Sequence, residues 1–119
     1  MILARITMNA LPEKQKELMQ TLLSMMETEG KERGCISYGI FCDINESTVF
    51  NLIEEWSTRE DFNRYILSER FSVLLGTKSL LAKPMEIKIH SVFHTEGNDT
   101  VYILRNQHRN RGLLQSGRI

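Results

Sequence analysis

The strongest constraint on the fold is a pair of neighbouring strands that carry apolar side chains on both faces. Residues 36–44 and 48–56 are rich in β-branched and aromatic residues, and the polar run 43–47 predicts a tight turn. Side chains of a strand alternate between the two faces of a sheet, so a strand with one wet face should alternate apolar and polar residues. Here both alternate sets contain large apolar groups, such as Leu52 in one and Ile53 in the other. Both faces of these strands therefore have to be covered.

The rest of the chain predicts the elements of one small α+β domain. Residues 2–8 alternate as a strand, and Pro12 suits the first position of a helix that runs to about Lys31. Ser57 with Glu60 predicts the capping box of a later helix. The predicted order is strand 2–8, helix 12–31, strand 36–44, strand 48–56, a helical region 57–81 weakened at Gly76, and strand 85–93. This βαββαβ order is the ferredoxin-like arrangement, an antiparallel sheet with its helices on one face.

Helices on one side of the sheet leave the other face open. Because that face also carries apolar groups, a partner or a ligand is expected to cover it. A second copy of the chain is the expected partner, in a sheet-to-sheet homodimer that buries well over ~1,000 Å² in total.

Charge and composition divide the chain into a domain, residues 1–96, and a polar basic tail, residues 97–119. The domain holds 11 Lys and Arg against 14 Asp and Glu, whereas the tail holds four arginines against Asp99. A domain with a net charge of −3 is not expected to bind nucleic acid. The tail is expected to be disordered, or to add a short strand through its apolar residues 101–104.

The cysteines and the absence of long apolar runs indicate a cytoplasmic protein. Cys35 and Cys42 lie in one predicted strand, about 23 Å apart by strand rise, which is far beyond disulfide reach. Free thiols are typical of a reducing compartment. The N-terminus lacks the pattern of a leader, and no run approaches ~18 apolar residues, so no contact with a membrane is expected.

Several short motifs resemble the antibiotic biosynthesis monooxygenase family over about residues 1–95. They are Gly34-Cys-Ile-Ser-Tyr38, then Glu54-Glu-Trp56, then a polar helix start and Phe71. The resemblance implies ferredoxin-like domains that pair as a dimeric α/β barrel. It also implies the oxidation of a quinol- or anthrone-like aromatic by molecular oxygen, with no metal, flavin or haem. A small aromatic substrate and a second copy of the chain are therefore the expected partners.

Cofactor-free oxidation requires little from the protein, because a deprotonated, electron-rich aromatic can react with oxygen itself. The protein supplies a base or hydrogen-bond partner, a dry aromatic pocket and a way to hold the anion. The residues expected to take part in catalysis are Arg70, Tyr65 and Glu54, and those expected to bind substrate are Tyr38, Trp56, Phe71 and His90.

The resembled family often carries histidines where this chain has Tyr65 and Arg70, so a histidine base is absent from those positions. Tyr65 could hydrogen-bond a substrate oxygen and Arg70 could stabilise a phenolate. His90 is a further candidate for a lone base, because its ordinary pKa suits proton transfer at neutral pH. The simpler alternative is that Tyr65 packs under the helix and Arg70 is solvated.

Other interpretations remain open at the level of sequence. Trp56 could belong to the core with Glu54 paired to a basic neighbour such as Arg5. His90 and His94 lie about 13 Å apart by strand rise, too far to share one metal ion. The haem-degrading relatives of this fold are disfavoured, because Leu75 stands in the place of their axial histidine. The alternative function is a non-catalytic dimeric domain that binds a small molecule.

Overall fold

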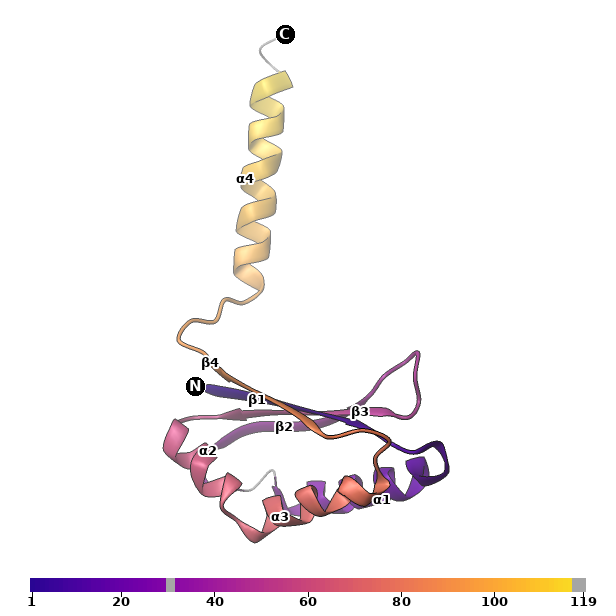
Figure 1. Cartoon of the computed structure of the whole chain (residues 1–119). Helices are drawn as coiled ribbons and strands as arrows, with labels where there is room; N and C mark the ends of the chain where they lie inside the picture. The colour runs from indigo at the N-terminus through magenta and orange to yellow at the C-terminus, as the bar shows by residue number, and fades with distance from the viewer. Residues whose placement is uncertain (30–31, 117–119) are drawn as a thin grey trace.

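The computed structural model describes residues 1–29 and 32–116 and confirms the ferredoxin-like prediction. Its four-stranded antiparallel sheet has the order β2–β3–β1–β4 (Figure 1). The strands are β1 (Ile2–Asn9), β2 (Cys35–Cys42), β3 (Val49–Trp56) and β4 (Glu86–Ser91). Consecutive strands β2 and β3 form a hairpin, whereas β1 lies between β3 and β4.

The helices between these strands cover a single face of the sheet (Figure 1). They are the 3₁₀ turn η1 (Pro12–Lys14), α1 (Gln15–Glu29), α2 (Arg59–Ile66), α3 (Glu69–Gly76) and the 3₁₀ turn η2 (Thr77–Leu80). At Gly76, the predicted weak point of the later helical region, α3 ends and the chain continues as η2. The predicted cap at Ser57 is wrong by one residue. Thr58 caps α2 instead, because its hydroxyl accepts a hydrogen bond from the Asp61 amide at 3.1 Å.

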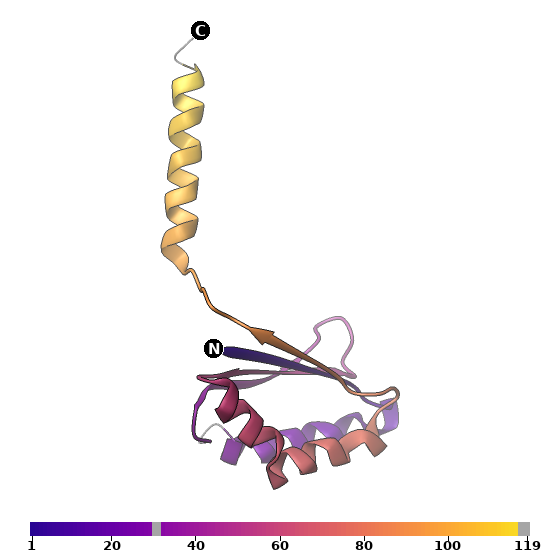
Figure 2. The ribbon, with the colours of Figure 1, turned by 60° about the vertical axis from the view of Figure 1, so that its left-hand side comes forward.

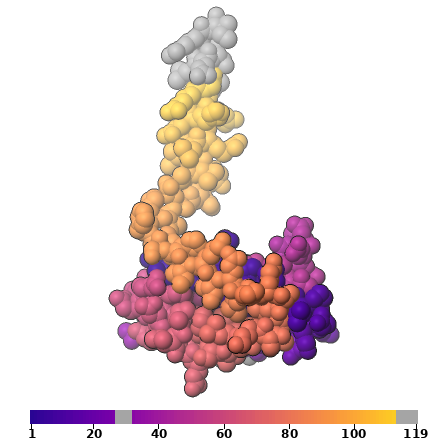
Figure 3. Space-filling view, in the orientation of Figure 1, coloured from indigo at the N-terminus to yellow at the C-terminus, as the bar shows by residue number. Residues whose placement is uncertain are grey.

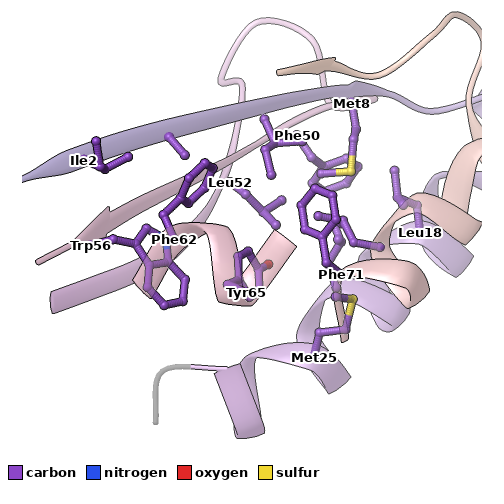
Figure 4. Close-up of a cluster of buried hydrophobic side chains, with 14 of the residues drawn as sticks. Ile2, Met8, Leu18, Met25, Phe50, Leu52, Trp56, Phe62, Tyr65 and Phe71 are labelled. Atoms are coloured by element: carbon purple, nitrogen blue, oxygen red, sulfur yellow. The ribbon is translucent and has the colours of Figure 1, made fainter. Parts of the chain in front are cut away.

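The hydrophobic core fills the space between the sheet and the helices, as the labelled side chains of Figure 4 show. From β1 it receives Ile2, Ala4, Ile6 and Met8, and from β3 it receives Phe50, Leu52 and Trp56. The helices contribute Leu18, Leu22, Met25, Phe62, Tyr65, Phe71 and Leu74. Period-2 alternation in the strands and helical spacing in α1 to α3 produce this core.

The strand register decides which side chains face the helices and which face away. Tyr38 of β2 lies opposite Glu54, and Gly39 lies opposite Ile53. The irregular pairing between Cys35 and Ser37 is consistent with a bulge at the start of β2. We call the uncovered side the outer face. It carries Leu3, Arg5, Thr7, Ser37, Gly39, Phe41, Val49, Asn51, Ile53, Glu55, Glu86, Lys88 and His90.

The C-terminal residues differ from the predicted disordered tail or strand. Residues Asn98–Ser116 form a helix, α4, which rises from the outer side of the sheet in both ribbon views (Figures 1 and 2). The expectation failed because the four apolar residues 101–104 are consecutive and give no helical period. In the space-filling view α4 stands clear of the body (Figure 3). Within the described ranges, no helix is both long enough and apolar enough to cross a membrane.

Candidate functional site

The most unusual side chain of the core is the carboxyl group of Glu54. It belongs to the inner set of β3 and is 0% exposed between the sheet and the helices. Two neighbours donate hydrogen bonds to it. The Tyr65 hydroxyl donates to Oε2 at 3.0 Å, and the Trp56 indole nitrogen donates to Oε1 at 3.3 Å. A buried carboxyl group needs such donors, because its transfer out of water is costly.

Aromatic rings surround this carboxyl group. Trp56 and Tyr65 stack with ring centroids 4.7 Å apart, and the edge of Tyr65 meets Phe71 at 5.3 Å. Phe62 lies 6.3 Å from Trp56 on the other side (Figure 4). We call Glu54, Trp56, Tyr65 and Phe71 the Glu54 cluster. Each of its four residues is no more than 4% exposed.

Local sequence explains how α2 and α3 bring these rings together. Phe62 and Tyr65 are three residues apart, so they point from the same face of α2 toward the sheet. Ser68 then ends one helix and begins the next, because its hydroxyl donates to the Tyr65 carbonyl at 2.6 Å and accepts from the Phe71 amide at 3.3 Å. The resulting corner places the first turn of α3 beside the end of α2. Phe71 therefore meets Tyr65.

Tyr38 reaches the same side of the sheet from the neighbouring strand. It lies directly opposite Glu54 in the β2–β3 register, and its hydroxyl oxygen is buried although the residue is half-buried overall. Five of the predicted site residues thus share one face of the sheet or the helices packed on it: Tyr38, Glu54, Trp56, Tyr65 and Phe71.

The other two predicted site residues lie elsewhere. Arg70 is on the surface at the start of α3, where its guanidinium forms an ion pair with Glu32 at 2.8 Å. His90 is exposed on the outer face, opposite Leu3 of β1. Arg5 is also on the outer face, opposite Ile53, so the alternative that pairs it with Glu54 is wrong: the two side chains project from opposite faces.

Gly34, just before β2, lies against the Asp61 side chain of α2. Gly34 has a φ of +84°, and a Cβ atom there would collide with the Asp61 side chain. Asp61 accepts hydrogen bonds from Arg64 at 2.9 Å and from the Thr58 hydroxyl at 2.9 Å. The Arg64 bond, with the Thr58 bond next, lowers the pKa of Asp61 below its usual value.

In the described part of the chain, no group of three or more His, Cys, Asp or Glu side chains could hold a metal ion. The thiols of Cys35 and Cys42 donate hydrogen bonds to the carbonyl groups of Ser37 and Ser47, each at 3.5 Å. The chemistry that this arrangement can support is proton transfer at a buried carboxyl group between aromatic walls.

Sequence reasoning missed two features of the cluster and its immediate surroundings. It did not foresee that Trp56 and Tyr65 both donate to Glu54. It also did not include Phe62, which the i, i+3 spacing with Tyr65 on a capped helix would have indicated.

Comparisons with known proteins assign the chain to a family. Residues 1–73 match the family model of antibiotic biosynthesis monooxygenase. An uncharacterized protein of Synechocystis sp. is 31% identical over 86 residues, which are 71% of this chain and 58% of that protein. The chain therefore spans less than two thirds of the length of this relative.

Solved structures have the same fold. A conserved protein from Methanosarcina mazei is 28% identical with a TM-score of 0.72, and the match covers 77% of this chain and 92% of that one. A protein from Deinococcus radiodurans classed with the antibiotic biosynthesis monooxygenases is 18% identical with a TM-score of 0.75, covering 82% and 97%. On the extent of the family-model match, the chain belongs to the antibiotic biosynthesis monooxygenase family.

Proposed function

We propose that this protein is a cofactor-independent monooxygenase that oxidises a quinol- or anthrone-like aromatic with molecular oxygen. The observation that carries the proposal is the Glu54 carboxyl group, fully buried in an aromatic cluster and held by the Tyr65 and Trp56 donors. Such a carboxyl group is rare in a small core, because apolar residues of similar volume would often be at least as stable. Its presence is more readily explained by chemistry than by packing.

The reaction can be written with an anthrone. The substrate loses a proton to become an electron-rich anion, which reduces oxygen. One oxygen atom forms a new carbonyl group on the ring, and the other leaves as water with the two hydrogens of that ring carbon. The substrate supplies all the electrons, so atoms and electrons balance without another reductant.

In this scheme Glu54 accepts the first proton and the Tyr65 hydroxyl donates a hydrogen bond to the developing oxyanion. The rings of Trp56, Tyr38 and Phe71 form the walls, since flat aromatic faces suit a flat aromatic substrate. Arg70 lies on the surface at the start of α3, and its charge would favour the substrate anion that forms when Glu54 takes the proton. His90 has no place in this pocket, because it lies on the outer face.

Substrate binding requires the cluster to open. Glu54, Trp56 and Tyr65 are no more than 1% exposed, so the described conformation is closed around them. The corner between α2 and α3 is the element that carries Tyr65 and Phe71 together. A small outward movement of this corner would expose the carboxyl group and two aromatic walls at once.

The protein acts as a homodimer in this proposal, with the outer faces of two sheets in contact. Phe41 is 53% exposed, and its ring occupies the space where a Gly39 side chain would be, since a Cβ atom there would come within 2.8 Å of the ring. Ile53 lies directly opposite Gly39. These residues form an apolar patch that none of the described helices covers, which favours a second sheet as its partner.

A second candidate function is a non-catalytic domain that binds a small aromatic molecule. It is favoured by positions 65 and 70, which carry tyrosine and arginine rather than a histidine base. It also agrees with the hydrogen bonds that Glu54 already accepts from the fold.

Oxygen consumption separates the two candidates. Purified protein is mixed with a panel of anthrones and naphthohydroquinones, and the rate above spontaneous oxidation is compared with thermal-shift binding of the same compounds. Turnover that falls about 100-fold in Glu54→Gln supports the monooxygenase. The matched control is Glu46→Gln in the exposed β2–β3 turn, which should keep the wild-type rate. Binding without turnover of any compound would select the non-catalytic domain.

A further inference from the structure

The second turn of α4, residues 101–104, is apolar on every side and exposed on every side. Val101, Tyr102, Ile103 and Leu104 are consecutive, so they point in four directions around the helix axis. Each is between 55% and 62% exposed. A helical segment that is apolar all round normally lies inside a folded structure. Its own body cannot provide that environment, because α4 stands clear of it (Figure 3).

The direction of α4 indicates what covers this turn. The helix rises on the outer side of the sheet, opposite to α1, α2 and α3 (Figures 1 and 2). This is the side on which the second copy of the proposed dimer would lie. A linker of only six residues, 92–97, separates β4 from α4, so the apolar turn stays close to the edge of the sheet.

Length and charge agree with a second copy as the occupant. The 19 residues of α4 span about 28 Å, whereas packed sheets lie ~10 Å apart, so the helix passes the second sheet and reaches its helix layer. Beyond its apolar turn α4 is basic. Residues 98–116 hold Arg105, Arg109 and Arg111 against Asp99, a net charge of +2, whereas residues 1–96 carry −3. Opposite charges favour contact between α4 and the body of another copy.

We infer that α4 is a clasp: in the homodimer it docks along the body of the second copy, residues 1–96, and its apolar turn 101–104 is buried at the seam between the two copies. This inference rests on the sheet-to-sheet dimer proposed above. By two-fold symmetry each copy gives one helix and receives one.

Photochemical cross-linking of the full chain tests the clasp. Tyr102→p-benzoylphenylalanine copies are mixed with ¹⁵N-labelled copies that lack the photo-label, irradiated and digested, and the joined peptides are identified by mass. Attachment to residues 1–96 of the ¹⁵N copy is expected. The matched control carries the same label at Asn63, exposed on α2 on the opposite side of the molecule, and should give no such product.

A second variant pair measures the energy of the contact. Ile103→Glu should raise the dimer dissociation constant at least about tenfold, because it places a charge in the apolar seam. Gln107→Glu adds the same charge one turn later on the same side of α4. It should change the dimer dissociation constant less than about threefold.

The outcomes distinguish the clasp from the dimer. A wild-type protein that scatters light as a monomer at micromolar concentration overturns both. A wild-type dimer with no cross-link, or with cross-links only between two α4 helices, overturns the clasp and leaves the dimer. The clasp is also overturned if wild-type protein binds anionic vesicles and gives no cross-link. That result would assign α4 to a membrane surface.

Discussion

Removal of one hydroxyl group, in Tyr65→Phe, tests the hydrogen bonds of the Glu54 cluster. The variant deletes the donor 3.0 Å from Glu54 Oε2 and keeps the ring that stacks on Trp56 at 4.7 Å. Core packing is therefore nearly unchanged. What is lost is one hydrogen bond to a buried acceptor, and the acceptor is left without that donor. Such a loss costs about 1–3 kcal/mol of the free energy of unfolding.

Urea unfolding measures this loss. Trp56 is the only tryptophan and lies inside the cluster, so its fluorescence reports the transition. The free energy of unfolding of a small protein falls by about 2 kcal/mol per molar urea. The urea concentration at the unfolding midpoint should therefore fall by about 0.5–1.5 M, with this dependence on urea unchanged. All variants are compared at one protein concentration, because dimer formation would add to the apparent stability.

The control is Ser79→Ala, which removes a hydroxyl group from an exposed residue outside both the cluster and α4 and should change stability by less than about 0.5 kcal/mol. A double-mutant cycle with Glu54→Gln then gives the coupling between the Tyr65 and Glu54 side chains, expected at about 0.5–3 kcal/mol. If Tyr65→Phe costs no more than Ser79→Ala, the Tyr65 hydroxyl does not hold the carboxyl group, and the proposed arrangement of the site is wrong.

Three further variants test other contacts. Gly34→Ala should destabilise the protein by more than about 1 kcal/mol in thermal melts, because its φ is +84° and the new methyl group meets Asp61; a wild-type melt would contradict this. Asp61 has a lowered pKa in the folded state, so its contribution is present above the ordinary value of 3.8 and is lost as pH falls through the folded value. Asp61→Asn should therefore flatten the stability profile below about pH 4, and an unchanged acid limb would be inconsistent with the Arg64 and Thr58 bonds. Arg70→Ala removes a surface ion pair with Glu32 and should cost less than about 1 kcal/mol in urea unfolding. It should lower turnover, because the substrate anion loses a nearby positive charge; a large stability loss with unchanged kinetics would make Arg70 structural.

The fold could be predicted from the sequence because its signals are local and agree with one another. Period-2 alternation in β1 marks Ile2 and Ile6 as one face, and the same rule groups Leu52 with Glu54 and Trp56 in β3. The order of these segments, together with Pro12 and Gly34 at their ends, leaves few topologies other than the ferredoxin-like one.

The candidate site was less predictable, because it depends on which face of β3 meets the helices. Both faces of β3 are apolar, so alternation alone could not decide between the sets of Leu52 and Ile53. This ambiguity is why Arg5 could be considered as a partner of Glu54, although the register places them on opposite faces. The helix α4 was missed for a related reason, since consecutive apolar residues carry no period from which a helix can be recognised.

The most direct test of the central claim is the fate of isotopic oxygen. Wild-type protein, Glu54→Gln and Glu46→Gln are each given an anthrone under oxygen-18 gas, with a protein-free sample to measure spontaneous oxidation. Wild type and Glu46→Gln should accelerate the reaction, place one labelled atom in the new carbonyl group and release the other as water. Glu54→Gln should be slower by about 100-fold while still folded. A rate equal to the protein-free sample for every anthrone and hydroquinone tried, or full activity in folded Glu54→Gln, would contradict the proposed function.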